Sequence, residues 1–118
     1  VLSSISNGYI FYDFWFTHCM PCISQFPDLK KIYAEYHQKG FRIVGILSDV
    51  IENTNEWKSL IRSSHLTWEH YLDLNLAIAN EFSIKKFPTN YLMDKNGKIV
   101  AKDLSPAQLL AFLNTHLK

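Results

Sequence analysis

The sequence lacks three features that would point to common classes of small protein. It has only two cysteines among 118 residues, whereas a small domain held together by disulfides carries several spread along the chain. It has no run of about 18 apolar residues, so we predict no membrane-spanning helix. Its 12 basic and 11 acidic residues give a net charge of +1, so we expect neither nucleic acid nor an anionic membrane as a partner.

What is present fits one globular domain. Hydrophobic residues make up 47% of the chain, which excludes a disordered protein, and the length is too short for two ordinary domains. We predict a lead-in at residues 1–8 and a single domain over residues 9–118. Because the chain starts at Val1 rather than Met, we expect a processed or trimmed piece, and no leader with a charged and an apolar region indicates its compartment.

The first half of the domain predicts a strand, a helix and a second strand. Residues 9–16 are nearly all aromatic or β-branched, apart from Asp13. Apolar positions then recur at helical spacing from Cys22 to Tyr36. The continuous apolar run within residues 41–48 is typical of a strand that is buried on both faces of a parallel sheet. Together these segments predict a right-handed βαβ unit.

Short helices and one more strand follow. Asn53 and Glu56 have the N-cap and N3 spacing of a capping pair, so we predict that a helix begins there. A strand near residues 69–72 and a short helix over residues 75–82 come next. These elements would connect the βαβ unit to the last part of the sheet.

The end of the chain predicts a hairpin and a closing helix. Asn96 and Gly97 stand between alternating runs at residues 89–94 and 98–103, which is a strong signal for an antiparallel hairpin. Ser105, with Pro at the first helical position after it, predicts the start of the last helix. The predicted fold class is therefore α/β, with a central mixed sheet of a parallel βαβ unit plus a C-terminal antiparallel hairpin, flanked by helices.

The chemistry is concentrated in Cys19-Met20-Pro21-Cys22, where the first strand gives way to the first helix. A disulfide between cysteines this close in sequence adds little stability, so reactivity explains the pair better. Unsatisfied N–H groups and the helix dipole favour a thiolate at Cys19, and Pro21 suits the first turn because it lacks an N–H. We expect Cys19 to attack a substrate disulfide and the more buried Cys22 to resolve the mixed disulfide.

Two residues near the cysteines have alternative interpretations, and a later proline has a predicted isomer. Asp13 either lies beneath the cysteines and takes the proton of Cys22, or is an ordinary buried carboxyl that is bonded to backbone. His18 either lowers the pKa of the Cys19 thiol when it is protonated, or is an exposed loop residue with little effect. Pro88 begins a predicted strand, and the general preference of X–Pro bonds predicts a trans peptide.

These residues resemble a known superfamily. The pattern reads Asp13-Phe14-Trp15-x-x-x-Cys19-x-Pro21-Cys22, with Pro27 in the next helix and Phe87-Pro88-Thr89 before a strand. It resembles the thioredoxin superfamily over residues 9–117. The tracts at residues 41–49 and 94–100, with Gln25-Phe26-Pro27, look most like the TlpA/ResA-type thiol-disulfide oxidoreductases.

The resemblance implies how a site is arranged around the two sulfurs. Pro88 would be cis, face the sulfurs and keep metals away from them, while the Phe87 backbone would pair with an extended substrate. Trp15 would pack beside the disulfide, and Asp13 matches the buried acid of thioredoxins. Thr89 either contacts substrate or is an ordinary strand residue.

Three positions depart from the family pattern. His18 stands where many members have Trp, and Met20 stands where thioredoxins have Gly, so the redox potential does not carry over. Gln25 replaces the Glu of ResA-like members, which argues against a specific role in cytochrome c maturation. We expect substrate choice to depend on the surface around Met20, Phe87 and residues 83–86.

The sequence therefore predicts a thiol-disulfide oxidoreductase that exchanges a dithiol and a disulfide with protein substrates, as a reductant fed by an upstream electron-donor protein. No cofactor or metal is expected, since the sulfurs carry the electrons and one CxxC pair supplies two of the four ligands that zinc needs. The resemblance implies a place outside the bacterial cytoplasm, and we expect a monomer. The alternatives are a redox-inactive binding module and a copper chaperone that uses the thiolates.

Overall fold

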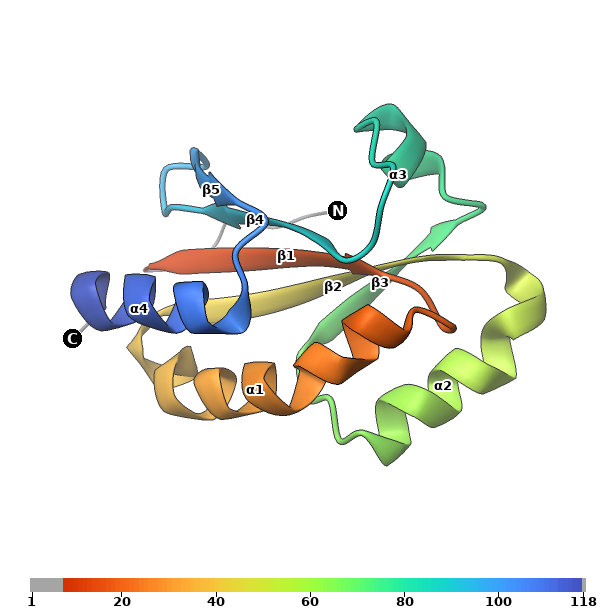
Figure 1. Cartoon of the computed structure of the whole chain (residues 1–118), viewed down its shortest axis with the longest axis horizontal. Coiled ribbons are helices and arrows are strands. Elements are labelled where there is room, and N and C mark those ends of the chain that lie inside the picture. The colour runs from red at the N-terminus through yellow and green to blue at the C-terminus, as the bar shows by residue number, and fades with distance from the viewer. Residues whose placement is uncertain (1–7, 118) are drawn as a thin grey trace.

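The computed structural model describes residues 8–117, which form a five-stranded sheet with helices on both faces (Figure 1). The strand order is β3-β2-β1-β4-β5. Three parallel strands come first in sequence: β1 (Tyr9–Trp15), β2 (Phe41–Asp49) and β3 (Glu69–Leu74). The antiparallel hairpin of β4 (Thr89–Met93) and β5 (Ile99–Lys102) pairs with the other side of β1. The predicted mixed sheet is confirmed. Of the predicted lead-in at residues 1–8, only Gly8 is among the described residues.

The helices divide unevenly between the two faces of the sheet. One face carries α1 (Met20–Tyr36), α2 (Thr54–Ser63) and α4 (Pro106–His116), and the other carries α3 (Ala77–Glu81) (Figure 1). Single 3-10 turns, η1 (His37–Lys39) and η2 (Ile51–Asn53), precede β2 and α2. The α3 helix is shorter than predicted, because Asn75 and Leu76 have φ angles of 56° and 61°, outside the helical region. None of the helices within residues 8–117 has the length and apolar composition that a membrane span needs.

Alternation along β1 places Asp13 on the same face as the two cysteines. Phe11 and Trp15 belong to one core cluster with Cys19 and Cys22. The alternate residues of the strand, at positions 10, 12 and 14, pack in a second cluster toward α3. Because successive side chains of a strand point to opposite faces, the Asp13 carboxyl lies on the face that carries the disulfide.

The predicted N-cap position of α2 is confirmed, but the side-chain capping bond is absent. Asn53 is the N-cap residue but makes no side-chain capping bond. Its amide nitrogen donates a charge-assisted hydrogen bond to the Asp49 carboxylate at 2.7 Å. Glu56 pairs with His18 at 3.1 Å. By contrast, α4 begins with the capping box that Ser105 predicts.

The hairpin between β4 and β5 closes at the predicted turn. Gly97 has a φ of 81°, which a residue with a side chain rarely adopts. The Asp94 carboxylate accepts main-chain N–H bonds from Asn96 and Lys98, each at 2.9 Å. These bonds fix the conformation of the turn. The turn is distant in sequence from the cysteines.

Candidate active site

Cys19 and Cys22 are joined in a disulfide at the start of α1. Cys19 is the N-cap residue of the helix, and its Sγ accepts a hydrogen bond from the Cys22 N–H at 3.2 Å. Pro21 occupies the first turn, as predicted. One of the unsatisfied N–H groups of the helix start is therefore directed at the Cys19 sulfur, where it can stabilise a thiolate.

The two cysteines do not differ in exposure, contrary to the expectation that Cys22 is the more buried. Cys19 is 2% exposed and Cys22 is 1% exposed, because both belong to the core cluster against which Phe16 and Phe87 pack. Met20, between them, is 68% exposed. In the oxidised protein the hydrogen bond to Cys19, rather than exposure, distinguishes the two sulfurs.

The residues that the resemblance placed around the sulfurs lie in the same region of the fold. Trp15 is fully buried in the core cluster of the disulfide, with its ring edge-to-face against Phe26. The Phe87–Pro88 peptide bond is cis, so the trans expectation is wrong. The trans preference of X–Pro bonds is only about 0.5–1 kcal/mol, and tertiary packing can override it. The Thr89 hydroxyl donates to the carbonyl of Lys86 at 2.7 Å, and the residue is buried.

Asp13 is an isolated acid on the disulfide face of the sheet. It is 2% exposed, and its Oδ1 has no hydrogen-bond partner among residues 8–117. Burial raises the pKa of Asp13 from 3.8 to about 7. A carboxyl that titrates near neutral pH can take up and release a proton under ordinary conditions, as a base for Cys22 must.

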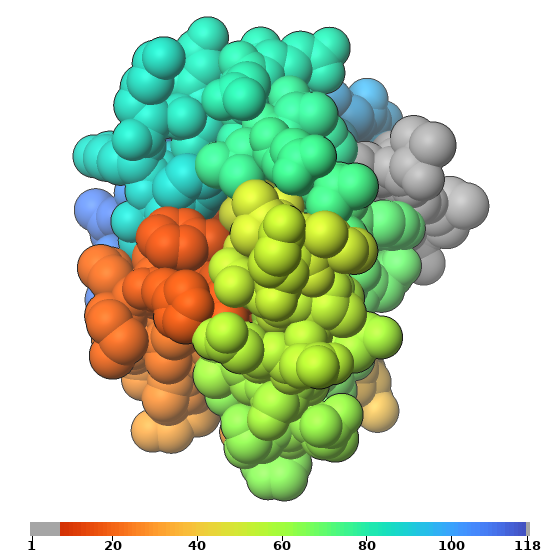
Figure 2. All heavy atoms as spheres, turned by 90° about the vertical axis from the view of Figure 1, so that its right-hand side faces the viewer, coloured from red at the N-terminus to blue at the C-terminus, as the bar shows by residue number. Residues whose placement is uncertain are grey.

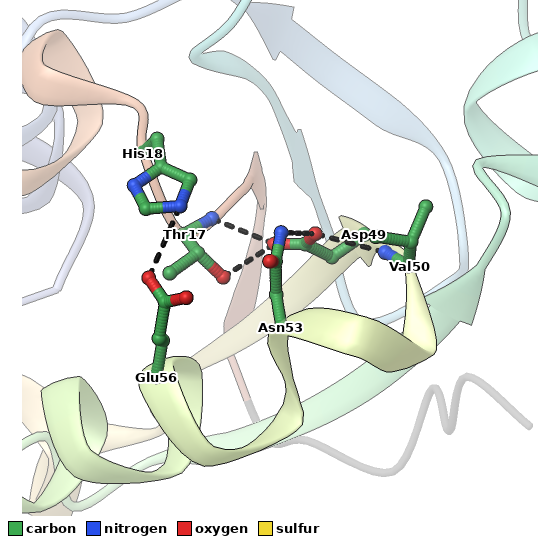
Figure 3. A network of polar contacts seen from close by, with 6 residues as sticks. All are labelled: Thr17, His18, Asp49, Val50, Asn53 and Glu56. Carbon is green, nitrogen blue, oxygen red and sulfur yellow. Dashed lines mark hydrogen bonds and ion pairs between the residues drawn. The ribbon is translucent and has the colours of Figure 1, made fainter.

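A polar network fastens the segment before Cys19 to the end of β2 (Figure 3). Asp49 Oδ2 accepts hydrogen bonds from the Thr17 N–H, at 2.8 Å, and from the Thr17 hydroxyl. Asp49 Oδ1 accepts from the Val50 N–H at 2.8 Å and from the Asn53 amide at 2.7 Å. Burial raises the pKa of Asp49, but these hydrogen bonds outweigh it and hold the pKa below its usual 3.8. The carboxylate is therefore a permanent acceptor at neutral pH.

His18 is exposed and has an acidic partner on α2. Its Nε2 lies 3.1 Å from Glu56 Oε2, and the two side chains are 64% and 56% exposed (Figure 3). When His18 is protonated, the Glu56 carboxylate opposes its field at Cys19. The influence of His18 on the thiol is therefore smaller than that of an unpaired histidine.

The surface beside Cys19 is hollowed toward α2. The hollow has a volume of about 790 Å³, and nine residues line it: Thr17, His18, Met20, Ile23, Asn55, Glu56, Ser59, Leu60 and Ser63. Figure 2 faces this end of the molecule, with the start of α1 in red-orange beside η2 and α2 in yellow to green. Met20 thus borders a surface that can hold part of a partner, whereas residues 83–86 do not line it.

The redox-active group that the structure provides is the disulfide itself. Within the part of the chain that the structure describes, no three His, Cys, Asp or Glu side chains are grouped to hold a metal ion. Sequence reasoning missed Asp49, Glu56 and His70, whose surroundings are formed by residues distant in sequence. Gly45, a glycine inside a buried strand, was the one available sign that another group approaches the sheet there.

Comparisons with known proteins agree with this geometry. A family model described as thioredoxin-like matches residues 7–99. The thiol-disulfide oxidoreductase ResA of Bacillus cereus is 30% identical over 101 residues, which are 86% of this chain and 57% of that protein. The chain spans little more than half the length of this curated relative.

Solved structures share the fold over nearly the whole chain. The thioredoxin domain of a thiol-disulfide oxidoreductase from Bacteroides vulgatus is 30% identical with a TM-score of 0.84, covering 95% of this chain and 81% of that one. A thiol:disulfide interchange protein from a Bacteroides species is 31% identical with a TM-score of 0.80, covering 94% and 74%. By its sequence, its fold and the position of its disulfide, this chain belongs to the thioredoxin-like family.

Proposed function

We propose that this chain is a thiol-disulfide oxidoreductase that reduces disulfide bonds of protein substrates with its Cys19–Cys22 dithiol. The observation that carries the proposal is the Cys22 N–H that donates to the Cys19 sulfur at the start of α1. A donor in this place stabilises the thiolate, which is the nucleophile of disulfide exchange. Relatives named thiol-disulfide oxidoreductases support the same activity.

The exchange proceeds in two displacements. The Cys19 thiolate attacks one sulfur of the substrate disulfide, the bond between the substrate sulfurs breaks, and one substrate thiolate leaves. Asp13 then takes the proton of the Cys22 thiol, and the Cys22 thiolate attacks Cys19 Sγ. The second substrate thiolate leaves. The substrate is now reduced, and Cys19 and Cys22 are oxidised to a disulfide. An upstream dithiol protein restores the reduced state by the reverse steps.

Neither an organic cofactor nor a metal takes part in this proposal, since the sulfurs carry both electrons. The substrate docks as an extended segment along the Phe87 backbone, with Pro88 facing the sulfurs and Met20 at the border of the hollow beside α2. We propose a monomer that works outside the bacterial cytoplasm, in keeping with the TlpA/ResA resemblance.

Reduction of insulin with dithiothreitol as donor tests the activity. We expect turnover by the wild type, loss of turnover in Cys19→Ser, and an accumulated mixed disulfide in Cys22→Ser. A redox-inactive binding module would give no turnover although both thiols are intact. A copper chaperone would bind Cu(I) tightly through the reduced pair and leave insulin unreduced.

The redox potential tests the direction. It can be measured from Trp fluorescence in graded glutathione buffers. A value below about −230 mV supports a reductase, whereas a value above about −180 mV means that the chain donates its disulfide.

A further inference from the structure

Two cavities adjoin at the loop between α2 and β3. One has a volume of about 400 Å³ and lies between Lys58, Ile61 and Arg62 of α2 and residues 65–67. The other has a volume of about 290 Å³ and lies between Lys30, Tyr33 and His37 of α1 and the same loop. Figure 1 shows this loop passing beside α1 before the chain enters β3. Because His65 and Thr67 line both cavities, the two form one surface, which we call the His65 groove.

The groove is bordered by bases only. Lys30, Lys58 and Arg62 line it with the imidazoles of His37 and His65, and no described residue that lines either cavity is Asp or Glu. None of the three cations pairs with a carboxylate of residues 8–117. The dipole of α2 favours a base in its last turn, but it does not account for the bases that α1 adds. The positive charge of the groove is therefore left for a partner to balance.

His65 has a backbone conformation that glycine adopts more readily. Its φ is 54°, in the left-handed region. The His65 N–H donates to the carbonyl of Arg62 at 3.2 Å, and the next N–H donates to the carbonyl of Ile61 at 3.1 Å. This is a common pattern at a helix end, where glycine usually stands because a side chain costs stability. The helix end alone thus does not explain a histidine, whose ring instead borders both cavities.

The floor of the groove is apolar and recessed. Leu66 and Trp68 are 6% and 5% exposed, and the Tyr33 ring packs edge-to-face on Trp68 with its centroid at 5.5 Å. A helix on a membrane surface inserts projecting apolar side chains, and nucleic-acid bases stack on exposed aromatic faces. The recessed floor offers neither. A protein segment, by contrast, can lay an apolar side chain of its own on this floor while its carboxylates reach the bases at the rim.

We propose that the His65 groove binds an acidic segment of a partner protein, in which carboxylates flank an apolar side chain. Arg62 can hold one carboxylate through two parallel N–H bonds, and Lys30 and Lys58 act as point charges for others. The segment lies along α2, the helix that also borders the hollow beside Cys19. Binding at the groove requires no disulfide exchange, so this inference stands apart from the proposed function.

Titration of the oxidised protein with an acidic peptide tests the groove without turnover. The probe is the capped pentapeptide Glu-Glu-Phe-Glu-Glu, observed through the NMR signals of backbone amides. We expect saturable binding that shifts residues 61–68, with a Kd that rises about tenfold between about 50 and 300 mM salt, because the charges are exposed. The same peptide with Lys in place of Glu should not bind. An acidic peptide that does not saturate the protein at about 1 mM overturns the proposal.

Matched variants assign the binding to the groove. Arg62→Glu should raise the Kd about tenfold, because it places a like charge against the peptide. Lys95→Glu makes the same change of net charge in the exposed turn of the distant hairpin, and should alter the Kd less than about twofold. Equal effects of the two variants would mean that only the net charge attracts the peptide, and would refute the groove.

His65→Gly separates binding from folding. The substitution removes a left-handed side chain, so the urea midpoint should not fall. The Kd should nevertheless rise about threefold, because the residue that borders both cavities is gone. A Kd equal to that of the wild type would contradict the role of His65.

Other anionic partners provide the last comparison. Vesicles of phosphatidylglycerol with phosphatidylcholine and a short oligothymidine offer negative charge without acidic side chains. At about 150 mM salt we expect neither to bind, because neither has an apolar side chain that fits the recessed floor. Binding of vesicles or oligothymidine more tightly than of the peptide, weakened by Arg62→Glu, would overturn the assignment to a protein partner.

Discussion

The main-chain N–H and the hydroxyl of Thr17 both donate to one carboxylate oxygen of Asp49. Thr17 lies two residues before Cys19, and Asp49 is the last residue of β2. The other oxygen of the carboxylate is held by Val50 and Asn53 (Figure 3). One side chain therefore fixes the segment before Cys19 against the central sheet and the start of α2.

We expect Asp49→Asn to lower both stability and the rate of disulfide exchange. The amide presents an NH₂ group to donors that need an acceptor, which costs about 1–3 kcal/mol in urea unfolding. Exchange should slow in molecules that remain folded, because the Thr17 segment is no longer held. Asp94→Asn is the matched control, since it weakens two main-chain bonds in the distant hairpin and should leave exchange unchanged. An unchanged exchange rate in folded Asp49→Asn would contradict the positioning role.

The two buried groups beneath the disulfide should give opposite pH dependences of stability. Asp13 has a folded pKa of about 7 against 3.8, so between these values the folded protein holds a proton that the unfolded chain has released. Its contribution to stability therefore falls as the pH rises. His70 has a pKa of about 4 in the folded protein against 6.5 in the unfolded chain. Between these values the unfolded chain binds a proton that the folded protein does not. Its contribution rises with pH, and the two cancel between about pH 4 and 6.5.

Single substitutions should reveal the two opposite pH dependences of the unfolding free energy, which cancel in the wild type. Relative to the wild type, the unfolding free energy of Asp13→Asn should rise by about 1.4 kcal/mol per pH unit between pH 4.5 and 6, and that of His70→Phe should fall by about the same amount. Urea unfolding of the oxidised proteins at several pH values measures both slopes. Curves parallel to the wild type would mean that neither group has the protonation state inferred from its burial.

The sequence predicts those features of this fold that depend on neighbouring residues along the chain. The aromatic and β-branched run of β1, the spacing in α1 and the capping box at Ser105 are local patterns, and each is present in the structure. The CxxC pair is equally local, and its place at a helix start follows from the strand before it. Such features are predictable because backbone geometry and hydrogen bonding decide them within a few residues.

The features that the sequence did not predict depend on how segments distant in sequence pack together. Asn53 lies at the predicted N-cap, but its amide nitrogen donates to the Asp49 carboxylate, which Thr17 from a distant part of the chain also holds. Cys19 was expected to be more accessible than Cys22, yet both are packed in the core. His70 stands in register with Asp13 across three strands, with Gly45 between them. No local pattern contains that register.

Glu56→Gln should make the disulfide a slightly stronger oxidant. Removing the carboxylate takes away a negative charge beside His18 and Cys19, and this favours the thiolate. An exposed pair is worth about 0.2–1 kcal/mol, which corresponds to a rise in potential of about 5–20 mV. The rise should shrink at high salt, because the charges are exposed. Glu81→Gln, on α3 at the opposite face of the sheet, should leave the potential unchanged, and a lower potential in Glu56→Gln would refute the argument.

The hollow beside Met20 should matter to large substrates only. Ser59 is exposed at its lining, so Ser59→Trp fills part of the 790 Å³ without touching the sulfurs. We expect KM for a protein disulfide to rise about fivefold, the equivalent of losing roughly 1 kcal/mol of binding, with no change for oxidised glutathione. Thr115→Trp adds the same side chain to an exposed position of α4 and should alter neither. A small disulfide needs only the sulfurs, so equal changes for both substrates would place the effect at Cys19 and not in the hollow.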